Sequence, residues 1–177
     1  MNKRELANYQ AKQKMVNALF DLIRTQSLEN VFISELTDRA GVSRMAYYRN
    51  FSSKTDIIEY YLETILDEMF SLLKKDFEFW SLEYGTVFFT VMKRHKERIL
   101  QLHAMGLSGM FLSRFTATNE SLAGDMPYYS MDRYVLYYVA GGSYNMVIEW
   151  LSNGCRETPE QMAEMLADLI KIERFSK

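Results

Sequence analysis

The stretch ISELTDRAGVSRMAYYRNFSSKTDII, residues 33–58, contains two short helical patterns separated by a turn. The first pattern covers residues 34–40 and stops at Gly41, the residue type that most easily adopts a positive φ after a helix. Ser43 then offers its hydroxyl as the N-cap of a second short helix over residues 44–50. Two helices joined by three or four residues, one of them glycine, are typical of a helix-turn-helix.

Apolar residues recur at helical spacing on both sides of this stretch. Residues 5–26 carry the i, i+3, i+4, i+7 stripe of an amphipathic helix, and residues 54–79 carry about five turns of the same pattern. We expect the second of these helices to connect two domains. After it we predict helices at 84–95, 97–105, 108–117 and 131–152, a loop at 118–127, and a last helix that begins at the capping box Thr158-Pro159-Glu160-Gln161.

These patterns together predict an all-α protein of about nine helices. Residues 1–53 would form a three-helix helix-turn-helix domain, and residues 54–177 a larger helical domain. The chain has only two prolines and eight glycines, too few for the many turns of an all-β fold. Its content of 48% hydrophobic and 25% charged residues is that of a globular protein with a buried core.

The net charge of −2 is unevenly distributed along the chain. Residues 1–56 contain nine Lys or Arg and six Asp or Glu, whereas residues 57–177 contain twelve and seventeen. The basic part, at +3, therefore coincides with the helix-turn-helix, as expected of a domain that binds nucleic acid. The polar start of the chain and the absence of an apolar run near 18 residues lead us to expect a cytoplasmic protein with no membrane partner.

The sequence gives no sign of an enzyme. His95 and His103 are eight residues apart, which is not the i, i+4 spacing of a helical metal pair, and no cysteine cluster is present. The chain also has no phosphate-binding glycine loop, nucleophile elbow or HExxH motif. We expect no catalytic residues, no metal and no cofactor, and interpret the single Cys155 as a bystander or a redox-sensitive thiol.

The same stretch resembles the N-terminal domain of the tetracycline-repressor (TetR/AcrR) family. The matching residues are Ala40-Gly41-Val42-Ser43, Tyr48, Phe51, Ser53-Lys54 and the apolar Ile33, Leu36 and Ile57. The resemblance covers roughly residues 10 to 60. It implies a double-stranded DNA operator as partner, a homodimer, and a C-terminal domain that binds a small-molecule effector.

Candidate DNA contacts lie on the second short helix. At about 100° per residue, Arg44, Met45, Tyr48 and Arg49 fall within one arc, and the first two lie near the N-terminus, where such a helix reads bases. Arginine can donate two hydrogen bonds to guanine, and methionine can pack on a thymine methyl. The resemblance implies phosphate contacts for Tyr48, Asn50 and Lys54. The full predicted set is Ser34, Ser43, Arg44, Met45, Ala46, Tyr48, Arg49, Asn50 and Lys54.

Four positions depart from the pattern of the family. Ser27 stands where a glycine is usual, so the turn after the first helix would be strained or reshaped. Phe32 replaces a threonine that caps the second helix and touches phosphate, and it can do neither. Tyr47 replaces a leucine-like core residue, and its hydroxyl needs a partner if buried. Asn50 replaces a histidine.

The C-terminal domain is rich in methionine and aromatic side chains, which line adaptable apolar pockets or pack in a core. As a group, the pocket candidates are Phe88, Phe89, Met92, Leu102, Met105, Met110, Phe111 and Tyr144. The resemblance implies that the last two helices pair with their copies in a second subunit, and we place Tyr137, Gly141, Ile148, Leu151, Met162, Leu166, Leu169 and Ile170 at that interface.

Gly141-Gly142 in mid-helix costs about 1 kcal/mol per glycine in helix propensity. A close approach to the partner subunit or a ligand would offset that cost, and so would packing within one subunit. The stretch Tyr138-Val139-Ala140-Gly141-Gly142, followed by Trp150 and the Thr158 helix, resembles regulators related to dihydroxyacetone-kinase genes.

The function predicted from the sequence is a sequence-specific DNA-binding transcriptional regulator, expected to be a repressor. A small-molecule effector would control its affinity for the operator. Two alternatives remain at this point: an activator with the same fold, and a ligand-free helical module that binds another protein.

Overall fold

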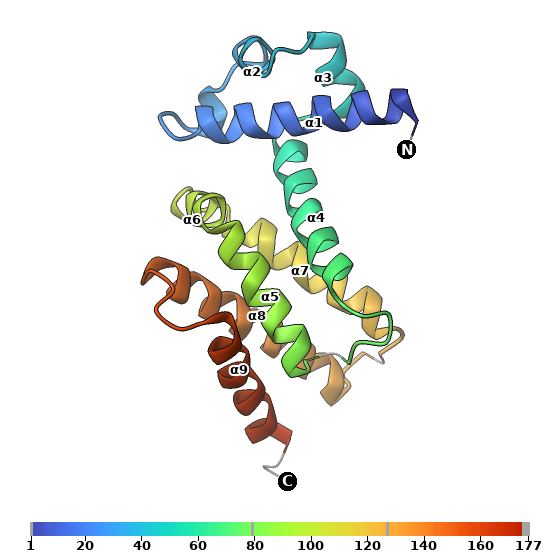
Figure 1. Ribbon diagram of the computed structural model, residues 1–177, viewed down its shortest axis with the longest axis vertical. Coiled ribbons are helices and arrows are strands. Elements are labelled where there is room, and N and C mark those ends of the chain that lie inside the picture. Colours follow the sequence, from blue (N-terminus) through green and yellow to red (C-terminus); the bar gives the residue numbers. More distant parts are fainter. Residues whose placement is uncertain (1, 79, 127, 175–177) are drawn as a thin grey trace. The chain divides into compact units, whose positions relative to one another are not determined.

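The computed structural model describes residues 2–78, 80–126 and 128–174 (Figure 1). Within these residues it contains nine α-helices and no strand, which confirms the predicted all-α fold. The chain divides into two compact units, residues 1–62 and 63–177. Phe79 and Pro127, the predicted ends of the connector helix and of the loop, lie outside the described residues.

The first unit is built on a long helix, α1, against which α2 packs (Figure 1). The predicted apolar stripe of α1, including Val16, Leu19 and Phe20, is buried. The ring of Phe20 meets that of Tyr61 edge to face, with centroids 4.7 Å apart, so α1 also packs on α4. The elements of this unit are α1 (Lys3–Leu22), the 3-10 helix η1 (Leu28–Asn30), α2 (Ile33–Ala40), α3 (Arg44–Asn50) and the first half of α4 (Lys54–Leu72).

The second unit is a helical bundle in which α5 and α9 pack side by side along their lengths (Figure 1). The two helices approach closely at Gly85, where an added Cβ would lie 2.9 Å from the Cβ of Ala163. Further contacts join α7 to α8 and α6 to α8. Besides the second half of α4, the unit contains α5 (Leu82–Arg94), α6 (Lys96–Ala104), α7 (Ser108–Ala123), α8 (Met131–Ser152) and α9 (Pro159–Arg174).

The helices lie within two residues of the prediction except at three ends. Helix α1 ends at Leu22 instead of residue 26. The connector helix α4 ends at Leu72 instead of reaching residue 79, because residues 74–76 are Lys-Lys-Asp and supply no apolar side chain to continue its buried stripe. Helix α7 continues to Ala123 through the first part of the predicted loop. There Asn119 is buried; its amide donates to the carbonyl of Phe115 at 2.7 Å and accepts from the Tyr84 hydroxyl at 3.0 Å.

The start of α9 confirms the predicted capping box. The hydroxyl of Thr158 accepts from the main-chain N–H of Gln161 at 3.3 Å, and the side chain of Gln161 accepts from the N–H of Thr158 at 2.8 Å. Each residue thus satisfies an N–H of the other at the exposed helix end. None of the described helices combines the length and the apolar character that a membrane span requires.

Candidate nucleic-acid interface

The turn between α2 and α3 has the conformation that Gly41 predicts. Gly41 adopts φ 62° and ψ 40°, and the N–H of Val42 donates to the carbonyl of Thr37 at 3.0 Å. A Cβ at Gly41 would meet nothing within 4 Å, so the conformation, not the space, favours glycine. The Thr37 hydroxyl donates to the carbonyls of Ile33 and Ser34 within α2. The turn therefore sets α3 at a fixed angle to α2.

Helix α3 begins where the sequence predicts, at the N-cap Ser43. Its hydroxyl accepts from the N–H of Ala46 at 3.1 Å. On the inner side of the helix Tyr47 is only 1% exposed, and its ring lies between those of Tyr48 and Phe51. Burial is the main cause that raises the pKa of the Tyr47 phenol. An aromatic ring therefore fills the leucine-like core position and anchors α3.

The outer side of α3 carries the side chains expected to contact DNA. Met45 is 70% exposed and Tyr48 is 63% exposed, and Arg44 and Arg49 are also exposed. These four side chains share one arc of the helix, and Met45 and Arg49 lie farthest from the buried Tyr47. The structure therefore leaves the predicted base-reading and phosphate-contacting residues accessible.

Lys54, predicted to contact phosphate, is engaged within the first unit. Its ammonium donates to the carbonyl of Leu28, to that of Glu29 at 3.0 Å and to that of Val31 at 2.9 Å. An ammonium has three donors, so these carbonyls at η1 use all of them. The carbonyls of Glu29 and Val31 lie at the end of η1, where carbonyls lack partners within the helix, and the lysine ammonium donates to them.

The start of α4 holds a capping residue that the sequence analysis missed. Asp56 accepts from the N–H of Ser52 at 2.8 Å and from that of Ser53 at 3.1 Å, and the N–H of Asp56 donates to the Ser53 hydroxyl at 3.1 Å. The Ser53 hydroxyl also donates to this carboxylate, and these hydrogen bonds lower the pKa of Asp56. These N–H groups at the start of α4 thus have partners within the protein. In the sequence, the Ser-x-x-Asp spacing of Ser53 and Asp56 indicates this helix cap.

The remaining predicted residues are less exposed. Ser34 and Ala46 are half-buried, and the Asn50 amide donates to the Ala46 carbonyl at 2.8 Å. Phe32 is the N-cap residue of α2 without a side-chain hydrogen bond, as its chemistry predicts. Ser27 adopts φ −71° and ψ 155°, so the chain after α1 is reshaped and needs no left-handed residue there.

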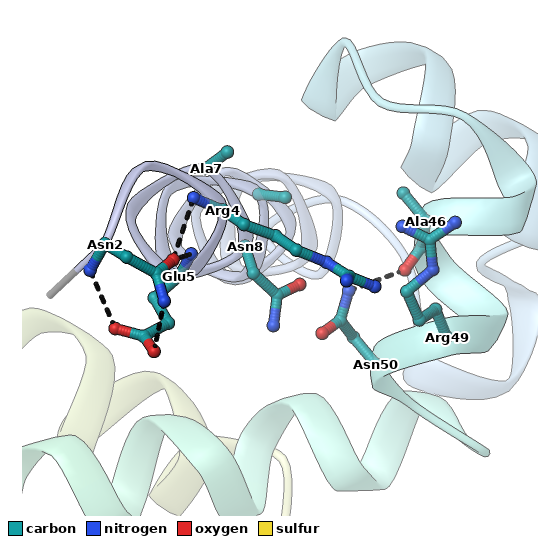
Figure 2. A pocket seen from close by; sticks show the side chains of 9 residues that line it. Asn2, Arg4, Glu5, Ala7, Asn8, Ala46, Arg49 and Asn50 are labelled. Atoms are coloured by element: carbon teal, nitrogen blue, oxygen red, sulfur yellow. Dashed lines mark hydrogen bonds between the residues drawn. The ribbon is translucent and has the colours of Figure 1, made fainter.

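A groove of about 610 Å³ separates the start of α1 from α3 (Figure 2). On the α3 side it includes three predicted residues, and on the α1 side it includes Arg4 and Asn8, which the sequence analysis did not single out. In Figure 2 the Arg4 side chain extends across the groove toward α3. The residues that line it are Asn2, Arg4, Glu5, Ala7, Asn8, Ala11, Ala46, Arg49 and Asn50.

In the second unit, the predicted pocket residues form part of an aromatic core. The rings of Phe88 and Phe115 stack with centroids 5.1 Å apart, and those of Phe111 and Tyr144 lie 5.7 Å apart. The Ser143 hydroxyl, also buried, has no hydrogen-bond partner among the described residues. Of the eight candidates, Met105 and Met110 are half-buried, and Phe88, Phe89, Met92, Leu102, Phe111 and Tyr144 are buried.

The predicted interface residues separate into inward-facing and outward-facing groups. Tyr137 and Leu169 are exposed and Gly141 is half-buried, so these three are accessible. The others, Ile148, Leu151, Met162, Leu166 and Ile170, are buried within the unit itself, so little of their surface is left for a second subunit. Both sides of α8 are apolar, so helical spacing alone did not distinguish the inner side from the outer side. Three further large side chains of α8 and α9 are exposed although the sequence pattern did not identify them: Tyr134, Tyr138 and Met165.

A second groove, of about 430 Å³, lies at the junction of α8 and α9. Trp150 and Met162 line it together with Met146, and the Trp150 indole N–H donates to the carbonyl of Glu157 at 3.1 Å. Neither this groove nor the groove beside α3 is lined by any of the eight predicted pocket residues.

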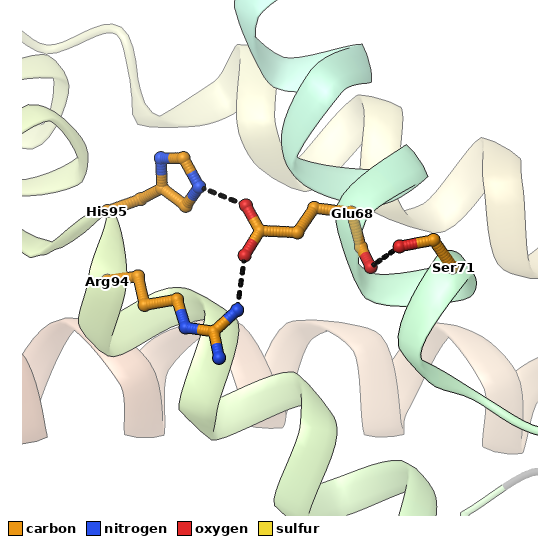
Figure 3. Close-up of polar contacts among 4 residues, drawn as sticks. All are labelled: Glu68, Ser71, Arg94 and His95. Atoms are coloured by element: carbon orange, nitrogen blue, oxygen red, sulfur yellow. Dashed lines mark hydrogen bonds and ion pairs between the residues drawn. The ribbon is translucent and has the colours of Figure 1, made fainter.

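Within the second unit, an ion-pair cluster joins the end of α4 to the end of α5 (Figure 3). The Glu68 carboxylate lies 2.6 Å from Nη1 of Arg94 and 2.9 Å from Nε2 of His95. Burial raises the pKa of Glu68, but the hydrogen bonds from His95 and Arg94 outweigh it, so the pKa is lowered overall. The carboxylate is therefore charged at neutral pH and holds the two helices together.

Comparison with known sequences gives two family matches. Residues 16–61 match the model of bacterial regulatory proteins of the tetR family, and residues 107–172 match that of a transcriptional regulator C-terminal region. An uncharacterized HTH-type transcriptional regulator of Bacillus subtilis (strain 168), YvdT, is 27% identical over 124 residues, or 67% of this chain. The match spans 61% of the length of that relative.

Solved structures show a similar fold. A TetR transcriptional regulator from Streptococcus agalactiae 2603V has a TM-score of 0.64 and 14% identity, and the match covers 94% of this chain and 97% of that one. The dihydroxyacetone kinase operon activator DhaS has a TM-score of 0.59 and 11% identity, with 92% and 95% covered. At such identities the similarity establishes the shared fold alone.

Proposed function

The chain belongs to the TetR family of bacterial regulatory proteins, and on this premise we propose that it binds operator DNA as a homodimer, represses transcription, and releases the DNA when it binds a small-molecule effector. One observation carries the proposal. Helix α3 exposes Arg44, Met45 and Tyr48 and is anchored by the buried Tyr47. A firmly anchored helix with an exposed cationic and apolar first turn suits the major groove.

The contacts follow from chemistry and position. Arg44 lies in the first turn of α3, where its guanidinium can donate two hydrogen bonds to O6 and N7 of a guanine. Met45 beside it offers apolar contact to a thymine methyl. Tyr48 and Arg49, further along the same exposed arc, would bind phosphates and so set the register of the helix. Lys54 has no part in these contacts, because its donors bind η1.

A binding assay on DNA from upstream of its own gene tests the proposal. We expect the wild-type protein to shift a specific fragment at salt concentrations that abolish binding to random DNA. Arg44→Ala should reduce the discrimination against a wrong base by about 1–3 kcal/mol per contact. Lys14→Ala removes an exposed charge from α1, away from α3, and serves as the control. The proposal fails if no fragment is preferred by the wild-type protein.

The second subunit would bind the outward side of α8 and α9. Tyr134 and Tyr138 on α8, and Met165 and Leu169 on α9, are large apolar side chains that are about half exposed or more. An apolar surface of this kind on two adjacent parts of a chain marks an interaction site. A C2 dimer formed there would present two copies of α3 to the two halves of a palindromic operator.

The effector would bind in the aromatic core of the second unit. Phe88, Phe111 and Tyr144 supply an apolar surface, and the buried Ser143 hydroxyl supplies a polar group with no described partner. Buried polar groups usually have a hydrogen-bond partner, so an unpaired one suggests a place for a ligand or a water. Ser143→Ala should leave folding intact and weaken the effector response, measured as release of the operator by the effector in the same assay.

A further inference from the structure

The groove between α1 and α3 brings two arginines from separate helices to one surface. Arg4 lies in the first turn of α1 and Arg49 in the last turn of α3, and both line the groove. Figure 2 shows the Arg4 side chain reaching across it toward the part of α3 that carries Ala46 and Arg49. Neither arginine forms an ion pair with a carboxylate of the described residues.

The positive charge of the groove comes from these side chains and not from the end of α1. At that end Asn2 caps the helix: its side-chain oxygen accepts from the N–H of Arg4 at 3.0 Å and from that of Glu5 at 2.9 Å. The Glu5 carboxylate accepts in return from the N–H and the side-chain amide of Asn2. Among the residues that line the groove, the one acidic side chain is therefore engaged in the cap, and the two guanidinium groups have no carboxylate partner among the described residues.

The position of the groove along α3 indicates which anion it binds. Arg44 and Arg49 are five residues apart, which is about 7.5 Å along a helix, or about two base steps of DNA. The groove thus lies beyond the bases that Arg44 would read, where the strand backbone passes. Guanidinium groups bind phosphate oxygens through two parallel N–H donors.

We infer that the groove binds a backbone phosphate of the operator just outside each half-site, with Arg4 and Arg49 as its ligands. The inference rests on the proposed binding of operator DNA. It adds α1 to the DNA-contacting surface and assigns to Arg4 a phosphate contact that it shares with Arg49 of α3. Because Arg4 contributes only its main-chain N–H to the cap, its side chain is available for this role.

The first test measures how the affinity of the dimer for its operator depends on salt. Arg4→Gln should lower the slope of log K against log salt by about two, since one phosphate contact is lost in each subunit. The ranking of operator variants should not change, because phosphate contacts carry no sequence information. Lys3→Gln removes the same charge from the same turn but lies outside the groove, and it should change the slope by less than half as much.

Phosphate ethylation interference on the wild-type complex gives a second readout that does not depend on the folding of a variant. We expect that ethylation of one phosphate per half-site, outside the base-reading positions, prevents binding of the wild-type protein. This interference should be lost in Arg4→Gln and kept in Lys3→Gln. If the wild-type protein prefers its operator, but this phosphate does not interfere or Arg4→Gln behaves like Lys3→Gln, the inference is wrong and the proposed function stands. If the wild-type protein prefers no DNA, the proposed function itself fails.

Discussion

At the scale of single residues, Lys54 illustrates how a side chain can match a family pattern and yet be engaged elsewhere. Its position predicts a phosphate contact, but its ammonium binds three carbonyls at η1, of Leu28, Glu29 and Val31. Hydrogen bonds to charged groups stabilise a fold by more than neutral ones do. Lys54 therefore fixes the loop between α1 and α2 to the start of α4.

We predict that Lys54→Met lowers the free energy of unfolding by about 1–3 kcal/mol, because the carbonyls at η1 lose a charged donor. Urea denaturation at a fixed protein concentration measures the change. Lys14→Met, at an exposed position of α1, is the matched control and should leave stability nearly unchanged. Unaltered stability of Lys54→Met, together with a smaller salt slope of DNA binding, would instead favour the phosphate contact.

The capping carboxylate Asp56 makes stability depend on pH. Its pKa in the folded protein lies below the ordinary value of 3.8, mainly because of its hydrogen bonds with Ser53 and Ser52. Its contribution is therefore fully present above that ordinary value and is lost as the pH falls through the lowered pKa. Asp56→Asn should be less stable than the wild type at about pH 6, and the difference should shrink at about pH 3.

Urea unfolding of both proteins at the two pH values checks this expectation. Asp67→Asn, at an exposed position of the same helix, provides the comparison for a general loss of charge from α4. A difference between wild type and Asp56→Asn that stays constant from about pH 6 to about pH 3 would show that the carboxylate does not act through its charge.

At the scale of elements, the contact between α5 and α9 depends on small residues. An added Cβ at Gly85 would lie 2.9 Å from the Cβ of Ala163 and 3.3 Å from its Cα, and neither atom belongs to a flexible side chain. A glycine inside a helix normally costs about 1 kcal/mol relative to alanine. The close approach of the two helices offsets that cost here.

Gly85→Ala should therefore destabilise the protein despite its better helix propensity. We expect a loss of about 1–3 kcal/mol from overpacking, less the gain of up to about 1 kcal/mol in propensity. Thermal unfolding followed by circular dichroism is a suitable measurement. Adding Ala163→Gly should recover part of the loss, because it removes the Cβ that the new methyl group meets. A single variant more stable than wild type would contradict the packing described here.

At the same scale, helix α7 continues beyond the C-terminal end that the sequence predicts. Residues such as Asn and Ser favour turns, so the sequence predicts that the helix ends near residue 117. The structure buries Asn119 and pairs it with Tyr84, from a helix 35 residues earlier in the chain. That pairing outweighs the local preference for a turn. Burial also raises the pKa of the Tyr84 phenol, which stays protonated and can donate.

At the scale of the whole molecule, charge and apolar surface are divided between the units. Residues 1–62 contain nine basic and seven acidic side chains, and residues 63–177 contain twelve and sixteen. The first unit therefore has a net charge of +2 and carries the candidate nucleic-acid interface. The second unit has a net charge of −4 and carries the exposed apolar side chains of α8 and α9. This division suits a protein in which one unit binds DNA and the other forms the dimer.

We expect Leu169→Glu to convert the proposed dimer to a monomer, because it places a charge on the exposed apolar side of α9. Sedimentation at several concentrations measures the oligomeric state, and operator binding should weaken in parallel. Leu122→Glu makes the same change at an exposed position of α7 and should leave the dimer intact. Leu166→Ala, at a buried position, should instead cost about 2–5 kcal/mol of stability. If Leu169→Glu remains a dimer, the interface lies elsewhere on the protein.

The sequence alone determined those features of this protein that depend on neighbouring residues. Helix positions, the turn at Gly41, the cap at Ser43 and the exposed arc of α3 follow from helical spacing and from hydrogen bonds within one or two turns. The same local rules excluded an all-β fold. They also contained the signal of the cap at Asp56, the Ser-x-x-Asp spacing, which the sequence analysis missed.

Only the tertiary structure decided which groups distant in the sequence meet. It directed Lys54 to carbonyls at least 23 residues away, turned Leu166 inward and Leu169 outward on one helix, and placed Arg4 beside Arg49. Helical periodicity identifies an apolar side but not its partner, because that depends on how separate helices pack. For this reason the exposed side of α3 was predictable from sequence, whereas the groove beside it was not.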